Sequence, residues 1–222
     1  MKDEGRRRII IAAGSDAEAA PDVALAQARI SHAIARDFAD AVGAYSRLSE
    51  TLAPQVEIEE LGAPWETEQR TEPSSVVLVC PLSTDGSHVC ASREAIENAL
   101  GCPSCPGSPL IYAIAYAVAP DEVGRHALDM LHDDVEQLDA SWGGALLLGS
   151  ADTLEHLYRL PRMGAYRRPV SHAIDLLVCA ARMREPLAQA MHSIGYEDPS
   201  NLICARPGLL PALRIHQAIW HR

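Results

Sequence analysis

Residues 75–81 read SVVLVCP, in which β-branched and aliphatic side chains follow Ser75 with no polar residue between them. Such a run is typical of a strand buried on both faces, as in a parallel sheet covered by helices. Three further runs share this character: Arg8–Ala13 (RIIIAA), Leu110–Val118 (LIYAIAYAV) and Gly144–Gly149 (GALLLG). A fifth run, Val56–Leu61 (VEIEEL), alternates apolar and acidic residues and therefore predicts an edge strand with one solvated face.

Helical periodicities lie between these strands. The longest starts near Asp22, which is a candidate N-cap, and stops before Pro54. Shorter helices are predicted over about 92–100 and 122–138, and a fourth begins near Pro169. Strands that alternate with helices predict an α/β fold, a doubly wound sheet of five parallel strands in the order 2-1-3-4-5 with helices on both faces.

The chain of 222 residues is long enough for one sizeable core, and we expect residues 1–222 to form a single domain. Residues from about 196 to 222 are expected to be a C-terminal extension that packs as a short helix or supplies an interface. The formal charge of −11 is spread along the chain and opposes binding to nucleic acid or anionic lipid. The apolar runs are too short for a signal peptide or a membrane span, so a cytoplasmic location is expected.

Cysteines and histidines give weaker signals. Four cysteines in apolar surroundings (Cys80, Cys90, Cys179 and Cys204) are predicted to be small buried hydrophobes, and the Cys102/Cys105 pair is not expected to have a function. No metal is expected: Glu122 and His126 have the spacing of two ligands on one helix face, but acidic helices often contain such pairs. Ser87 and His88 are neighbours on a turn without a nucleophile elbow, so a hydrolase is not expected either.

In an open α/β sheet, ligands bind beyond the carboxyl ends of the strands, where the strand order reverses. Four loops meet at this edge: Gly14–Asp22, Pro81–Cys90, Ala117–Glu122 and Gly149–Thr153. Each contains small or turn-forming residues that would let a flat ligand approach the backbone. The topology therefore predicts a small-molecule site at the carboxyl edge of the sheet.

Two of these segments resemble a known family. The run VVLVCPLSTDGSHVCASREAIENAL (residues 76–100) is similar to the third strand and following loop of NAD(P)H-dependent FMN reductases and related flavodoxin-like oxidoreductases. The run SWGGALLLGSADTL (residues 141–154) is similar to their last strand, and the tail NLICARPGLLPAL (residues 201–213) has a comparable layout. The resemblance implies a flavodoxin-like fold, bound FMN, hydride transfer from NAD(P)H and a homodimer.

The resemblance also assigns parts of the cofactor to the loops. The FMN phosphate would lie at the start of the first helix, where backbone N–H groups and the helix dipole favour an anion, and the isoalloxazine would lie against the loops after the third and fourth strands. It assigns no catalytic residue. The residues that it assigns to the cofactor are Gly14, Ser15, Asp16, Pro81, Leu82, Ser83, Thr84, Asp85, Gly86, Ala117, Val118, Gly149 and Ser150.

The first loop, GSDAEAAPD, departs from the family's pattern. Asp16, Glu18 and Asp22 stand where the family has hydroxyls and a positive charge for the phosphate. A cluster of arginines at positions 159, 162, 167 and 168 offers a second place for a cofactor phosphate. The alternative function is that of a flavodoxin-like protein that has lost FMN and binds another small molecule or a protein partner.

Overall fold

The computed structural model describes residues 8–49, 54–61, 75–83, 85–91, 93–100, 109–118, 122–138, 140–157, 159–197 and 199–208. Within these residues the chain forms one parallel sheet with the strand order β2-β1-β3-β4-β5-β6. The strands are β1 (Arg8–Ala13), β2 (Gln55–Glu60), β3 (Ser75–Pro81), β4 (Leu110–Tyr116), β5 (Ser141–Leu148) and β6 (Leu202–Ala205).

The α/β class and the order of the first five strands are confirmed, but the prediction of five strands is wrong. The chain returns after Gly195 and places β6 parallel to β5, with Leu202 opposite Ala145 and Ala205 opposite Leu148. This segment was expected to belong to a terminal helix or an interface. Because β6 has only four residues and follows Pro199, its sequence is too short to show the pattern of a buried strand.

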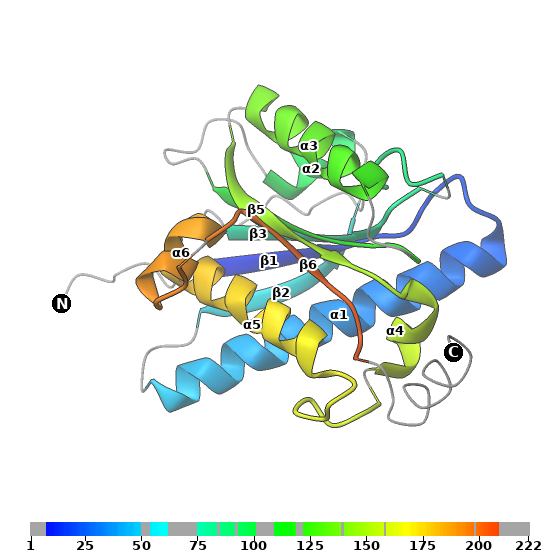
Figure 1. Ribbon diagram of the computed structural model, residues 1–222. Coiled ribbons are helices and arrows are strands. Elements are labelled where there is room, and N and C mark those ends of the chain that lie inside the picture. Colours follow the sequence, from blue (N-terminus) through cyan, green and yellow to red (C-terminus); the bar gives the residue numbers. More distant parts are fainter. Residues whose placement is uncertain are drawn as a thin grey trace.

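Helices cover both faces of the sheet (Figure 1). One face packs against α1 (Pro21–Leu48) and α5 (Arg168–Met183), and the other packs against α2 (Arg93–Leu100) and α3 (Glu122–Gln137). The short helices α4 (Ala151–Leu157) and α6 (Leu187–Ser193), which the sequence patterns did not predict, flank α5 in sequence. β1, β3 and β4 are buried almost throughout, as the unbroken apolar runs predict.

The first helix differs from its prediction at its N-terminal end. It begins at Pro21 with Ala20 as N-cap, so Asp22 lies in the first turn and is not the cap. Ile34 and Phe38 are fully buried against the sheet, but Leu48 at the end of the helix is 81% exposed. The last turn of α1 therefore extends beyond the sheet that its middle covers.

The start of β5 depends on two glycines that the sequence marks as WGG. A Cβ atom on Gly143 would lie 2.5 Å from the ring of Tyr112, and Gly144 has a φ of +120°. The Tyr112 hydroxyl donates to the carbonyl oxygens of Ala180 and Glu185, at 3.1 and 2.8 Å. These contacts tie β4 and β5 to the end of α5.

The described residues bear on the expectations about membrane spans and about buried cysteines. None of the described helices combines the length and the apolar character that a membrane span requires. The thiols of Cys80, Cys90, Cys179 and Cys204 are free, but only Cys80 is buried, and Cys204 is exposed on β6, contrary to prediction. The pair Cys102/Cys105 lies outside the described residues.

Candidate functional site at the carboxyl edge of the sheet

The loop between β1 and α1 begins under tight packing. The Gly14 N–H donates to the Val79 carbonyl of β3 at 2.9 Å, and a Cβ atom on Gly14 would lie 2.8 Å from the side chain of Leu61. A side chain at position 14 would therefore displace Leu61 where the chain leaves β1 between its two neighbouring strands. This is the switch point of the sheet, with β2 on one side and β3 on the other.

Asp16 turns into this loop and is only 9% exposed. Its carboxylate accepts the N–H of Glu18 at 2.9 Å, and its own N–H donates to Oε1 of Gln27 on α1 at 3.0 Å. The N–H of Ala19 donates to the Asp16 carbonyl at 3.3 Å. The main-chain N–H groups of Asp16, Glu18 and Ala19 are thus engaged inside the chain, and that of Glu18 already binds a carboxylate.

The buried hydroxyl groups of Ser31 and Tyr116 lie next to each other and contact the loop at Gly14. Ser31 of α1 donates to the Gly14 carbonyl at 2.6 Å, and its oxygen lies 2.9 Å from the Tyr116 hydroxyl. The Tyr116 hydroxyl in turn donates to the Gln27 carbonyl at 2.7 Å. Burial raises the pKa of Tyr116 well above its ordinary value. Tyr116 is therefore a core residue that links β4 to α1, and its ring does not form a surface for a ligand.

The chain after β3 forms a tight hairpin. Leu82 and Val89 form an isolated antiparallel β-bridge. The Ser83 N–H donates to the His88 carbonyl and the Cys90 N–H donates to the Pro81 carbonyl, each at 2.9 Å. Gly86 sits at the tip with a φ of +74°. These hydrogen bonds pair the main-chain groups of Pro81, Ser83, His88 and Cys90 with one another.

Asp85 organises the side chains of this hairpin. Its Oδ1 accepts the hydroxyls of Ser83 and Ser87, each at 2.7 Å, and the Ser87 N–H at 3.0 Å. These hydrogen bonds, that of Ser83 first, hold the pKa of Asp85 well below its ordinary value. The side chain is a fixed negative charge on the exposed side of the hairpin.

Ser87 and His88 are in contact, although adjacent residues on a turn were not expected to meet. The Ser87 oxygen lies 3.2 Å from Nδ1 of His88, and both side chains are exposed. Asp85 contacts the serine of this pair, so it does not orient the imidazole as the acid of a catalytic triad does. The cluster stabilises the turn and lacks the arrangement of a nucleophile with an oriented base.

Cys90 joins the two loops. Its thiol belongs to the hairpin and interacts electrostatically with the Asp16 carboxylate of the first loop. Burial, together with the negative charges of Asp16, Glu18 and Asp85, raises the pKa of the Cys90 thiol to about 12. Three carboxylates from two loops therefore surround one half-buried thiol at the switch point, and the local potential is negative.

The last two loops of the edge are tied to each other. The Ser150 N–H donates to the Val118 carbonyl at 2.9 Å, the Ala151 N–H donates to the Ala117 carbonyl at 3.0 Å, and Gly149 donates to Ala205 of β6 at 2.8 Å. Ser150 adopts a left-handed conformation with a φ of +61°. These bonds leave the Val118 side chain 73% exposed beyond β4.

A second apolar side chain lies close to the hairpin. Val123, in the first turn of α3, is 45% exposed, and its Cγ1 atom would be 3.5 Å from a Cβ atom on Gly86. Val118 and Val123 give the carboxyl edge an apolar component beside its acidic one.

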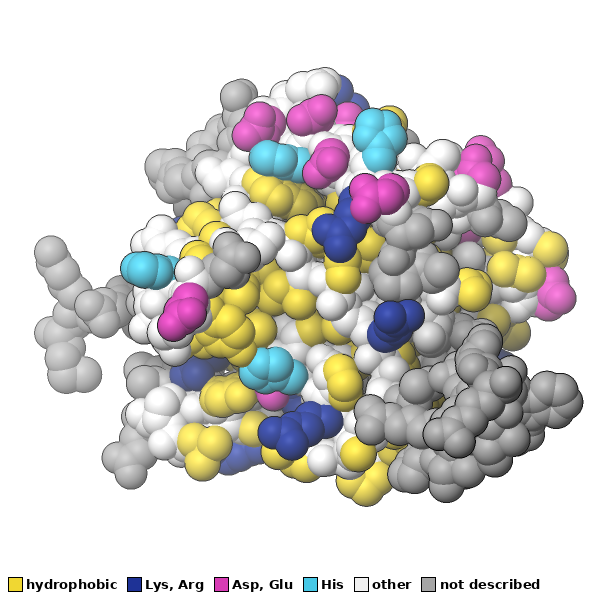
Figure 2. Space-filling model, viewed as in Figure 1, with side chains coloured by type: hydrophobic (Ala, Val, Ile, Leu, Met, Phe, Trp, Pro, Cys, Tyr) yellow, Lys and Arg dark blue, Asp and Glu magenta, His cyan; other side chains and the backbone are white. Residues whose placement is uncertain are grey.

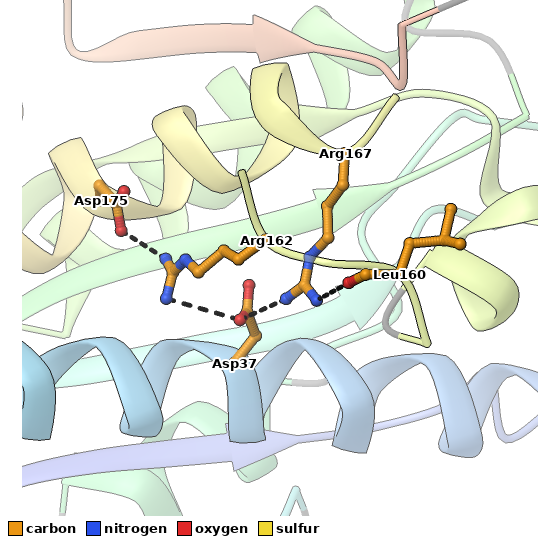
Figure 3. A network of polar contacts seen from close by, with 5 residues as sticks. All are labelled: Asp37, Leu160, Arg162, Arg167 and Asp175. Carbon is orange, nitrogen blue, oxygen red and sulfur yellow. Dashed lines mark hydrogen bonds and ion pairs between the residues drawn. The ribbon is translucent and has the colours of Figure 1, made fainter. Parts of the chain in front are cut away.

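The arginine cluster binds the chain itself (Figure 3). Arg167, which is buried, pairs with Asp37 of α1 and donates to the Leu160 carbonyl at 2.9 Å. Arg162 pairs with Asp175 of α5 and lies 3.6 Å from Asp37. This network locks the segment before α5 onto α1. The prediction that the cluster offers a second phosphate site is not supported for Arg162 and Arg167, because both guanidinium groups are already paired.

Most of the predicted site residues lie at this edge, as the topology requires. Gly14, Ser15 and Asp16 form the first loop, five predicted residues form the hairpin, and Ala117, Val118, Gly149 and Ser150 form the linked loops; Thr84 lies outside the described residues. The sequence analysis did not identify Gln27, Ser31 or Cys90 as part of the site. The spacing of Gln27 and Ser31 by four residues on the first helix places them on one face and was the only signal for them.

No group of three or more His, Cys, Asp or Glu side chains in the described part of the chain is arranged to hold a metal ion. Comparisons of the chain with protein-family models, with curated proteins and with solved structures found no match.

Proposed function

We infer that the chain is a flavodoxin-like protein that binds a small neutral or cationic organic molecule at the carboxyl edge of its sheet, without a phosphate-anchored flavin. The observation that carries this proposal is the inward carboxylate of Asp16, which accepts the Glu18 N–H inside the loop between β1 and α1. The Asp16 carboxylate therefore uses a main-chain donor in the loop where the phosphate of a flavin would need such donors.

Electrostatics supports the same conclusion. A carboxylate about 4 Å from a unit negative charge costs roughly 1 kcal/mol in water and about 4 kcal/mol at an effective dielectric constant near 20. Asp16, Glu18 and Asp85 all act on the Cys90 thiol, so a phosphate in this region would meet more than one such charge. A cation or a neutral ring avoids this cost and can use the apolar surface of Val118 and Val123.

The second candidate is an NAD(P)H-dependent FMN oxidoreductase, which the resemblance implies. The main-chain N–H groups of Ser15 and Ala17 favour it, because among the described residues they make no hydrogen bond and are open to a ligand. In this function the flavin would accept hydride from the nicotinamide, and the chain would position both. The expected homodimer belongs to this candidate as well.

The experiment compares three flat probes by their effect on the unfolding temperature: a cationic phenothiazinium dye, riboflavin and FMN. A ligand that binds only the folded state raises this temperature, and at equal ligand concentration the increase grows with the logarithm of the affinity. We expect the dye or riboflavin to raise it more than FMN does. An increase that is largest with FMN, together with NAD(P)H oxidation that depends on added FMN, would instead establish the second candidate.

A further inference from the structure

Among the described residues β6 is an edge strand of the sheet, and the direction of its main-chain groups follows from its hydrogen bonds with β5. Ala145 donates to the Asn201 carbonyl at 2.7 Å, and Gly149 donates to the Ala205 carbonyl at 2.8 Å. Main-chain groups of odd-numbered residues in β6 therefore face β5. Because successive residues of a strand alternate, the groups of Leu202, Cys204 and Arg206 face away from the sheet.

Four of these outward groups have no hydrogen-bond partner among the described residues. They are the Leu202 carbonyl, the N–H and the carbonyl of Cys204, and the Arg206 N–H. The Leu202 N–H differs, because it donates to the Ser200 hydroxyl at 3.1 Å. An exposed row of unpaired donors and acceptors is a template for another strand.

The two edges of the sheet differ in charge. The opposite edge strand, β2, carries Glu57, Glu59 and Glu60, and such charges oppose pairing with another chain. β6 reads LICA and has no charged residue, and the Cys204 side chain is exposed. Figure 2 shows hydrophobic side chains gathered around the position of α6 and β6, whereas the acidic side chains on this face lie mainly over α3.

We propose that β6 pairs antiparallel with β6 of a second copy of this chain, about a two-fold axis beside Cys204. In this register the Cys204 N–H donates to the carbonyl of the partner's Cys204, and the Arg206 N–H donates to the carbonyl of the partner's Leu202. The two-fold axis repeats both bonds. The register uses every one of the four open groups, so this edge is complementary to itself.

The uncharged edge also suits a second copy of the chain. Two molecules that each carry a formal charge of −11 repel one another, and a strand without acidic residues of its own adds little to this repulsion. The charge of Glu122 also acts on Cys204, but Arg125 opposes it. The interface lies along the open side of β6, so the inference is independent of which ligand binds at the carboxyl edge.

The test uses the full chain and a pair of variants at one position. Cys204→Pro removes the outward N–H and keeps every bond between β5 and β6, and proline is tolerated on an edge strand in that orientation. Cys204→Ser keeps the N–H and is the matched control. Sedimentation equilibrium should show dimers for the wild type and Cys204→Ser and monomers for Cys204→Pro. A monomeric wild type, or a Cys204→Pro dimer of undiminished affinity, would overturn the proposal.

Hydrogen exchange checks the same bond without a substitution. The Cys204 N–H should become more protected as the protein concentration rises, because dimerisation buries it. Protection that is equal at all concentrations in a monomeric protein would instead indicate that residues 209–222 of the same chain cover the edge, and it would contradict the proposal.

A cross-link tests the register. Residues opposite each other in a hydrogen-bonded antiparallel pair have Cα atoms about 5.5 Å apart, which lies within the range of roughly 4.4–6.8 Å found for disulfides. Diamide, which takes up the two electrons and two protons of a thiol pair, should therefore produce a disulfide-linked dimer. The dimer should be absent from Cys204→Ser. Its persistence in that variant would show that another register or another cysteine is involved.

Discussion

At the scale of single residues, Asp16 has the largest influence on what the carboxyl edge can bind. Its carboxylate contributes a negative charge, which repels an anionic ligand. It also accepts the Glu18 N–H, which is then not available to a ligand. The hydrogen bond from the Glu18 N–H needs only the acceptor oxygen of this side chain and not its charge. The charge can therefore be removed while the hydrogen bond is kept.

Asp16→Asn is expected to raise the affinity for FMN by about fivefold or more, because removal of one nearby negative charge is worth roughly 1 kcal/mol or more against a phosphate. The asparagine oxygen still accepts the Glu18 N–H, so the free energy of unfolding should change little. Flavin fluorescence and urea denaturation measure the two quantities. Asp22→Asn, in the first turn of α1, is the matched control for charge. An equal gain in both variants would mean that Asp16 has no special position.

Cys90 should be an unreactive thiol. Burial and the carboxylate of Asp16 raise its pKa to about 12, above an ordinary value of about 8.5, so the thiolate is scarce at neutral pH. We expect iodoacetamide to modify it about two orders of magnitude more slowly than an exposed thiol near pH 8. Its rate should still rise with pH above pH 9, where an ordinary thiol has levelled off. Peptide mass spectrometry measures this rate, and a plateau near pH 9 would contradict the assigned environment.

The raised pKa of Cys90 also affects stability in a defined direction. The folded state holds this proton more tightly than the unfolded state, so the contribution is fully present below the unfolded pKa of about 8.5. It is lost progressively as the pH rises from there towards the folded value of about 12.

At the scale of elements, the network of Asp37, Arg162, Arg167 and Asp175 joins α1 to the segment before α5 and to α5 itself (Figure 3). Breaking a buried ion pair by removing one partner leaves a charge without compensation in a poorly solvated place. The network is therefore expected to contribute to the position of the whole α4–α5 segment beside the carboxyl edge.

Asp37→Leu should lower the free energy of unfolding by about 3–5 kcal/mol, because two arginines lose their buried partner. Adding Arg167→Leu should restore part of the loss, since the double variant no longer buries an unpaired charge at that contact. Arg168→Ala, at an exposed neighbouring position, should change stability by no more than about 0.5 kcal/mol. Urea denaturation measures all three. A double variant whose cost equals the sum of the single ones would show that the pair is not coupled.

The elements also show which parts of the fold could be predicted from sequence. β1 and β3 were predicted with their observed bounds, because a strand buried on both faces has an unbroken apolar run. β6 was not predicted, since its four residues become a strand only through pairing with β5. The same limit applies to the site. The loops follow from topology, but whether Asp16 faces inward depends on partners such as Gln27, which lies eleven residues away.

At the scale of the whole molecule, the sheet order places four loops at one edge, and the charge of the chain determines which ligands that edge favours. The formal charge of −11 adds a repulsive field for any phosphate, in addition to the local effect of Asp16, Glu18 and Asp85. The arginines before α5 do not offset it at the site, because Arg162 and Arg167 are paired with Asp37 and Asp175. These charges are the basis of our proposal that the carboxyl edge binds a neutral or cationic molecule and disfavours the phosphate of FMN.

The most direct test of this claim is the ratio of the dissociation constants for FMN and riboflavin, measured by quenching of flavin fluorescence in the same protein and buffer. The two ligands share a ring and differ in the phosphate. We expect riboflavin to bind at least as tightly as FMN. We also expect the ratio of the two dissociation constants to approach one as added salt screens the carboxylates. FMN bound at micromolar concentration and about tenfold or more tighter than riboflavin would show a working phosphate site and would contradict the account.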